Sequence, residues 1–213
     1  MASRMLRVDT VTPAADVIEA AVRSLSEGEL VVAPTETRYG LLARADRQDV
    51  LEELYRVKQR PLTNPTALFV RGRSDLGSYG RVTPAAESLA ARYLPGPLTL
   101  VLESRHDWSP PRVVDGRIGL RYSSASLIAA LVGAVSFPLT ATSANRAGMP
   151  DFIGVDPIQA CFGDAVALYL DGGSLSAAPS TVVACLPSGV SIVREGSISR
   201  TEIARALEEA DGR

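Results

Sequence analysis

Apolar residues recur along the chain with two different spacings, and these predict helices interleaved with strands. The clearest helical repeat opens at Thr12-Pro13, because Thr can cap a helix and Pro is tolerated at its first position. Its apolar positions recur every three to four residues up to Leu25, and Gly28 ends it. Ser199 and Glu202 fit a capping box for the last helix. Similar signals predict further helices at 49–57, 84–94, 125–132 and from Asp156-Pro157 onward.

Short apolar runs bounded by polar or turn residues predict the strands. Two of them flank a Pro-Ser-Gly turn and indicate an antiparallel hairpin, at 180–185 and 190–194. Residues 34–41 look like a polar loop, and 103–116 like a polar, Pro-rich surface excursion. Early strands separated by helices favour parallel pairing, whereas the hairpin adds antiparallel pairs. The remaining strands are expected at 29–33, 67–70, 98–102, 117–121, 138–142 and 165–170.

This alternation predicts an α/β fold with an open, twisted, mixed sheet and surrounding helices. The 213 residues suit one domain over 1–213, with a core of about 13–200. A hydrophobic fraction of 46% is typical of a globular chain. No run approaches the ~18 apolar residues of a membrane span, so no membrane contact is expected. The net charge of −2 is not typical of a dedicated nucleic-acid binder.

Several common chemistries are disfavoured by what the sequence contains. Two cysteines, Cys161 and Cys185, make no disulfide framework and favour a reducing compartment, which predicts a cytoplasmic protein. With His106 as the single histidine, a four-ligand zinc site is disfavoured. The sequence has no P-loop, dinucleotide fingerprint or GxSxG motif. A Ser-His-Asp or Cys-His mechanism would depend on His106, which lies in the 103–116 excursion.

The remaining candidates for binding or catalysis are polar side chains at the ends of predicted strands and helices. Thr35 and Thr37 present hydroxyls in PTETRYG, although an ordinary β–α loop has the same pattern. Lys58 and Arg60 leave a helix end together and could clamp a phosphate, or simply favour the helix dipole. Asn64 follows them closely.

The later strand ends add small polar groups and two arginines. Ser143 and Asn145 lie in a TSAN segment, and Ser180 follows a DGG turn. Arg121 and Arg194 each end an apolar strand, where a solvated terminus is the ordinary alternative. Ligands of open α/β sheets bind beyond strand ends. This set of donors suits a phosphate-containing substrate and catalysis by positioning and charge stabilisation.

In order along the chain, the motifs resemble those of the YrdC-like threonylcarbamoyl-AMP synthases (TsaC). The resemblance covers about Glu19 to Ser199 and rests on PTETRYGL, KQRPLTNP, LPGPLTLVL, IGLR, TSANRAG, DGG, PSTVV and IVREG. It implies an enzyme that condenses L-threonine, bicarbonate and ATP into threonylcarbamoyl-AMP and pyrophosphate. It also implies Mg²⁺ with the ATP, a positively charged concave sheet face, and a separate tRNA threonylcarbamoyl transferase as the downstream partner.

The resemblance also assigns roles to residues. Lys58 and Arg60 are expected to act in catalysis and face the ATP phosphates, and no residue is expected to bind a metal. Threonine is expected to contact Thr35, Thr37, Arg121 and Ser180. The nucleotide is expected to contact Lys58, Arg60, Asn64, Ser143, Asn145 and Arg194. The sequence departs from the family pattern at Arg38, Phe69 and Tyr122–Ser126.

One alternative stays open at this point. A YrdC-like paralogue could bind nucleotide or structured RNA without synthase activity, which makes RNA a further candidate partner. The acidic net charge argues against RNA as the main ligand, although basic residues could still converge locally.

Overall fold

The computed structural model describes residues 2–211, so residue 1 and residues 212–213 of the predicted domain lie outside the described range. The helices are α1 (Ala15–Glu27), α2 (Gln48–Lys58), α3 (Leu76–Tyr79), α4 (Pro84–Tyr93), α5 (Ser126–Ala134), α6 (Val155–Phe162) and α7 (Arg200–Asp211). The first strands are β1 (Arg4–Arg7), β2 (Val31–Pro34), β3 (Tyr39–Leu42), β4 (Ala67–Phe69), β5 (Gly80–Arg81) and β6 (Leu98–Ser104). The later strands are β7 (Val113–Val114), β8 (Arg117–Arg121), β9 (Leu139–Ser143), β10 (Leu168–Asp171), β11 (Thr181–Leu186) and β12 (Gly189–Arg194).

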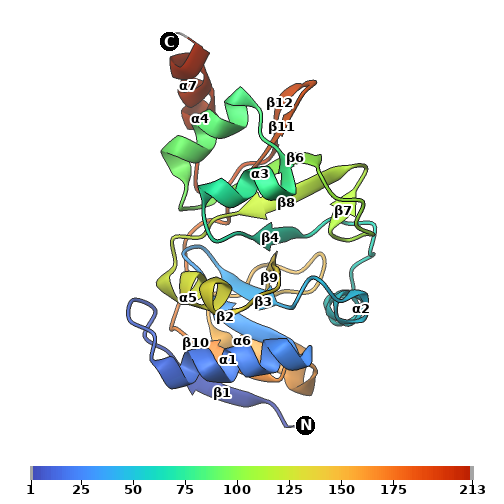
Figure 1. Ribbon diagram of the computed structural model, residues 1–213. Helices are drawn as coiled ribbons and strands as arrows, with labels where there is room; N and C mark the ends of the chain where they lie inside the picture. The colour runs from blue at the N-terminus through green and yellow to red at the C-terminus, as the bar shows by residue number, and fades with distance from the viewer. Residues whose placement is uncertain (1, 212–213) are drawn as a thin grey trace.

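The strands form one open mixed sheet, which confirms the predicted α/β fold class. Its order is β1-β10-β2-β3-β9-β4-β8-β6-β11-β12, with β5 beside β6 and β7 beside β8. The β1–β10, β10–β2, β4–β8 and β11–β6 pairs are parallel. The predicted hairpin of β11 and β12 is antiparallel, as expected. Figure 1 shows the sheet running from β1 near one end of the molecule to β11 and β12 near the other.

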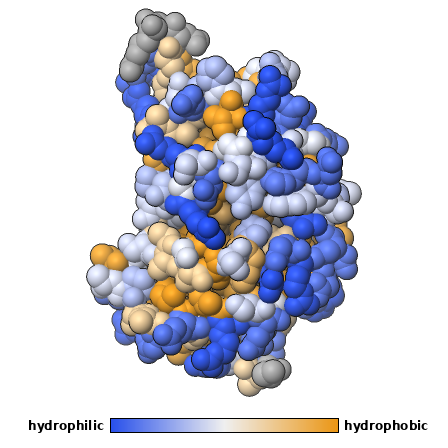
Figure 2. All heavy atoms as spheres, viewed as in Figure 1, coloured by the Kyte–Doolittle hydropathy of each residue, from blue (hydrophilic) through white to orange (hydrophobic). Residues whose placement is uncertain are grey.

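Helices cover the two faces of this sheet unequally. Alternate residues of a strand point to opposite faces, and β2 accordingly places Val32 in one apolar cluster and Val31 and Ala33 in another. Helices α1 and α5 pack on the second face near β2 (Figure 1). Figure 2 shows apolar side chains gathered on the surface around α5. Within residues 2–211, no helix covers the far half of that second face, from β4 to β12, which presents Thr99, Arg121 and Arg194 beside apolar residues (Figure 1).

Several predicted helix boundaries are correct, whereas the predicted loop at 34–41 and the predicted cap at Thr12 are wrong. Gly28 ends α1 in the left-handed conformation, and Thr83 caps α4 by accepting from the Ala86 N–H at 3.2 Å. The predicted capping box also forms, since the Ser199 hydroxyl donates to Glu202 at 2.6 Å. Residues 34–41 are not a loop throughout, because β3 returns antiparallel along β2. Thr12 does not cap α1, because the N-cap residue of this helix is Ala14.

The strands β1, β5 and β7 and the helix α3 were not expected from the sequence, and each is short. Strand β7 lies inside the 103–116 segment, which therefore is not wholly an irregular excursion. Within residues 2–211, no helix is long and apolar enough to cross a membrane.

Candidate functional site

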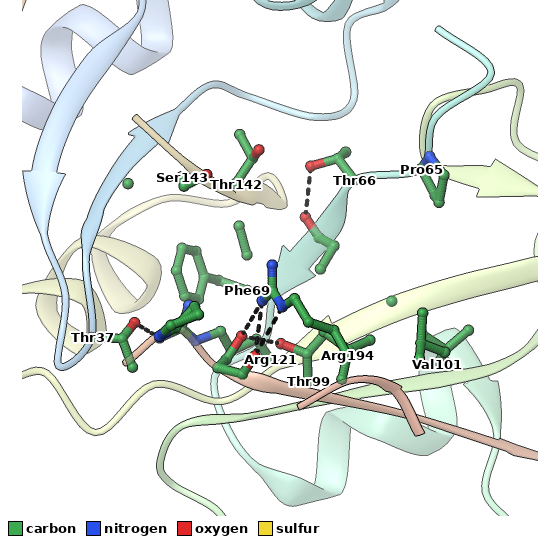
Figure 3. A pocket seen from close by; sticks show the side chains of 18 of the residues that line it. Thr37, Pro65, Thr66, Phe69, Thr99, Val101, Arg121, Thr142, Ser143 and Arg194 are labelled. Atoms are coloured by element: carbon green, nitrogen blue, oxygen red, sulfur yellow. Dashed lines mark hydrogen bonds between the residues drawn. The ribbon is translucent and has the colours of Figure 1, made fainter. Parts of the chain in front are cut away.

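A pocket of about 550 Å³ lies on the half of the sheet face that α1 and α5 leave uncovered. Alternate residues of neighbouring strands line it, as expected when one face of a sheet is presented. The intervening residues Leu68, Leu100, Leu120 and Val183 belong to the apolar core on the other face. At the end of β9, the successive residues Ala141, Thr142 and Ser143 all line the pocket. Figure 3 shows Thr37, Phe69, Arg121 and Arg194 around a common space, with Thr142 and Ser143 across from them. Strand residues in this lining include Gly40, Ala67, Phe69, Thr99, Val101, Gly119, Arg121, Ala141, Ser143, Val182, Ala184 and Arg194.

The turn between β2 and β3 brings two threonines to the pocket. The Thr35 hydroxyl accepts from the Thr37 N–H at 3.1 Å and donates to the Arg38 carbonyl at 2.7 Å. These bonds hold the turn, so the Thr35 hydroxyl is largely committed to backbone groups. The Thr37 hydroxyl instead accepts from Nη2 of Arg121 at 2.7 Å. The turn therefore connects directly to the guanidinium at the end of β8.

Arg121 is a buried cation whose guanidinium donates only through Nη2, so that Nη1 and Nε have no partner among residues 2–211. Its residue is 8% exposed, and Nη2 also donates to Oε1 of Glu36 at 3.0 Å. The guanidinium lies 5.7 Å from the centroid of the Phe69 ring. Its Nε is buried and has no hydrogen-bond partner among residues 2–211. A buried donor without a partner costs about 1–3 kcal/mol, so this position favours an acceptor supplied by a ligand.

Arg194 and Ser180 form a second polar group in the pocket lining. Nη2 of Arg194 donates to the Ser180 carbonyl at 2.8 Å and to its hydroxyl at 3.2 Å. The Ser180 hydroxyl lies 3.1 Å from that of Thr99. Burial lowers the pKa of Arg194, and the positive charges of Arg121 and Arg60 add to this against the opposing effect of Asp151. The charges of Arg121 and Arg60 therefore act on the Arg194 guanidinium in the same pocket.

Lys58 is not exposed to the pocket, which corrects the expectation that it would be open to ligand. It is the only lysine in the sequence and is 2% exposed. Its ammonium donates to the carbonyl of Ser143 and, at 2.7 Å, to that of Asn145. Burial, followed by the charge of Arg60, lowers its pKa from 10.5 to about 7. In this structure Lys58 holds the turn after β9, and its expected role toward phosphate stays a prediction.

The other expected site residues divide into two groups. Arg60 lines the pocket and donates to the Pro65 carbonyl at 2.8 Å. Asn64 and Asn145 do not line it. Asn64 is exposed, and the Asn145 amide is bound to the Ser143 hydroxyl and the Met149 carbonyl, both at 2.6 Å. The pocket thus brings together Thr35, Thr37, Arg60, Arg121, Ser143, Ser180 and Arg194, and leaves out Lys58, Asn64 and Asn145.

Sequence reasoning missed several residues of this site. Thr99 lies inside an apolar strand, where only the alternation of faces distinguishes it from its neighbours. Arg38 was noted as a departure but not assigned to a site; it lines the pocket and pairs with Asp151 at 3.5 Å. His106 lies outside the pocket lining and stacks on Trp108, with ring centroids 4.3 Å apart.

The fold and the site define an α/β protein with a sheet-face pocket suited to an anionic ligand. The family described as Telomere recombination (Sua5/YciO/YrdC) matches residues 23–196. The chain belongs to this Sua5/YciO/YrdC family, which confirms the resemblance seen in its motifs.

Individual relatives agree with this assignment. The Bacillus subtilis threonylcarbamoyl-AMP synthase is 33% identical over 190 residues, covering 87% of this chain and 55% of that protein. Pyrococcus abyssi Sua5 complexed with L-threonine has a TM-score of 0.88 at 28% identity, covering 97% of this chain and 62% of that one. Escherichia coli YciO has a TM-score of 0.82 at 25% identity, covering 94% and 98%. The chain therefore spans 55% and 62% of the two longer relatives.

Proposed function

We propose that this protein is an L-threonylcarbamoyladenylate synthase, which condenses L-threonine, bicarbonate and ATP into threonylcarbamoyl-AMP and pyrophosphate. The observation that carries the proposal is the convergence of Arg60, Arg121 and Arg194, from separate parts of the chain, on one pocket. Family membership and relatives named for this activity support it. The relative complexed with L-threonine supports the choice of amino acid.

The pocket offers groups for each part of the substrates. The unpartnered Nη1 and Nε of Arg121 suit the threonine carboxylate, and the hydroxyls of Thr37 and Ser180 lie in the same pocket lining for its polar groups. Arg60 and Arg194 suit the phosphates of ATP. The threonine amine and bicarbonate form a carbamate and water, and a carbamate oxygen then attacks the α-phosphorus. Pyrophosphate leaves with the electron pair of the broken P–O bond.

This reaction requires charge stabilisation and exclusion of water more than a protein nucleophile. Mg²⁺ enters as the MgATP substrate complex. Among residues 2–211, no group of three or more His, Cys, Asp or Glu side chains could hold a metal. The Asp151 carboxylate and Ser143 hydroxyl in the pocket lining fit a magnesium that arrives on phosphates, because Mg²⁺ typically takes one or two carboxylates plus phosphate and water.

The product is a mixed anhydride and therefore a reactive group donor. We propose that a separate tRNA threonylcarbamoyl transferase consumes it, and that both steps take place in the cytoplasm. A paralogue that binds nucleotide or RNA without making the product is the alternative. It is not favoured, because identity is 33% to the Bacillus subtilis synthase and 28% to Escherichia coli YciO. Direct RNA contact remains a separate proposal with no residue assigned to it.

The test is product formation from ATP, L-threonine, bicarbonate and Mg²⁺, followed by mass spectrometry and a pyrophosphate assay. We expect both products, and none when threonine or bicarbonate is omitted. Replacing threonine with serine measures the amino-acid preference. Absence of both products under conditions in which the Bacillus subtilis enzyme is active would refute the synthase proposal and favour the binding paralogue.

A further inference from the structure

Glu36 bonds the side chain of Arg121, Ser123 in turn bonds Glu36, and neither residue lines the pocket. Glu36 lies between two pocket residues, Thr35 and Thr37, but is not itself part of the pocket lining. Its Oε1 accepts from Nη2 of Arg121 at 3.0 Å, and its Oε2 accepts from the hydroxyl of Ser123. Glu36 therefore bridges the β2–β3 turn and the segment that follows β8.

The bridge is buried and has few ways to rearrange. The side chains of Arg121 and Glu36 are 10% and 14% exposed. Ser123 is 4% exposed, and its hydroxyl also accepts from the Ala125 N–H at 3.2 Å, immediately before α5. A chain of hydrogen bonds thus runs from the start of α5 through Ser123 and Glu36 to the guanidinium. Charge-assisted bonds of this kind are directional, so they fix orientation as well as charge.

The orientation determines which donor faces a ligand. Because a guanidinium is planar and rigid, anchoring Nη2 to Glu36 and Thr37 also sets the direction of Nε. The donors without a partner among residues 2–211 are Nε, which is buried, and Nη1, so anchoring Nη2 sets the direction of both. Without Glu36, the same guanidinium could rotate about its last torsions and present other donors.

We infer that Glu36 and Ser123 are positioning residues, which orient the unpartnered guanidinium donors of Arg121 toward the carboxylate of the amino-acid substrate. This inference rests on the proposed function for the identity of that substrate. Neither residue touches the substrate or the reacting atoms. Their effect is therefore specific to amino-acid binding and leaves ATP binding unchanged.

The test compares Glu36→Gln, Glu36→Ala and Ser123→Ala with the wild type by steady-state kinetics. Gln keeps the geometry, since its oxygen accepts from Arg121 and its amide donates to Ser123, so we expect a KM for threonine within about threefold of wild type. Glu36→Ala removes the anchor and is expected to raise that KM about tenfold or more. Ser123→Ala is expected to raise it about threefold to tenfold. The KM for ATP stays constant throughout.

Glu53→Ala is the matched control, because Glu53 pairs with Arg56 on the exposed side of α2, and it leaves both KM values unchanged. A KM for threonine that is unchanged in Glu36→Ala would overturn the inference. A tenfold lower KM in Glu36→Gln would also overturn it, because Glu36 would then act by reducing the charge of Arg121. If Glu36→Ala fails to fold by circular dichroism, the Gln and Ser123 variants decide.

The two proposals fail in different ways. A wild-type protein that makes no product refutes the synthase, and the inference is then judged by L-threonine affinity in calorimetry, which requires no turnover. The same order of affinities, with wild type close to Glu36→Gln and both tighter than Glu36→Ala, supports the positioning role. Absence of threonine binding by the wild type overturns both.

Discussion

Burial of the single lysine gives a prediction about how stability depends on pH. The Lys58 ammonium is 2% exposed and donates to two backbone carbonyls of the 143–145 turn. Burial lowers its pKa to about 7, whereas the unfolded chain has a value near 10.5. Between these values the unfolded state binds more protons than the folded state, so stability rises with pH. The penalty for the buried charge is fully present below pH 7.

The perturbation is Lys58→Met, which keeps the length of the side chain and removes the titrating group. The wild-type and variant chains share every other ionisable residue, so the difference between their unfolding free energies isolates Lys58. With a folded pKa of about 7, that difference should shift in favour of the wild type by about 2 kcal/mol between about pH 6.5 and about pH 8.5.

Urea unfolding at several pH values measures this difference. Because Lys58 is the only lysine, selective lysine labelling gives one side-chain signal, and its titration by NMR reports the pKa directly. The Met variant lacks this signal and serves as its control. A titration midpoint near 10.5, together with a pH-independent free-energy difference, would refute the reasoning. The ammonium would then be hydrated rather than buried in the turn.

Three further substitutions test the site and the fold. Arg60→Ala should raise the KM for ATP about tenfold, because Arg60 lies in the pocket lining. Since Arg60 is partly exposed, the same substitution should change the unfolding free energy by less than about 1 kcal/mol. Equal KM values for the wild type and the variant would remove Arg60 from the nucleotide site. Thr83→Ala should lower the unfolding free energy by about 1 kcal/mol in urea, because the cap of α4 is lost, and Thr83→Ser should restore it. Gly196→Ala should lower the unfolding free energy by about 1–3 kcal/mol, because the new Cβ would lie 2.1 Å from the Pro179 carbonyl oxygen. Thermal unfolding measures this change, and a variant as stable as the wild type would contradict the packing.

Elements with strong local signals could be predicted from the sequence. The run at 117–121 forms β8 and ends in Arg121, because an apolar alternation bounded by polar residues is sufficient to specify a strand. The hairpin of β11 and β12 and the cap at Thr83 follow from equally local patterns. The pairing of β3 with β2 was missed, because the intervening PTETR segment has none of the two-residue hairpin signals that identify such turns.

The candidate site was predicted less completely, and Lys58 shows why. A lysine at a helix end can extend into solvent or fold back, and the local sequence does not distinguish the two. The carbonyls that it contacts lie 85 and 87 residues further along the chain. Glu36 was missed for the same reason, since its partner Arg121 is 85 residues away. Contacts of this kind depend on the strand order of the finished sheet.

Beside its loop residues, the pocket is lined by one continuous run of hydrogen-bonded strands, β3-β9-β4-β8-β6-β11-β12. Strand β9 connects the part of the sheet covered by α1 and α5 to the part that carries the arginines. A ligand that contacts both sides of β9 therefore adds its binding energy to the stability of that connection. Slower amide hydrogen exchange along β3, β9 and β4 is the general signature of an occupied pocket, whichever substrate is bound.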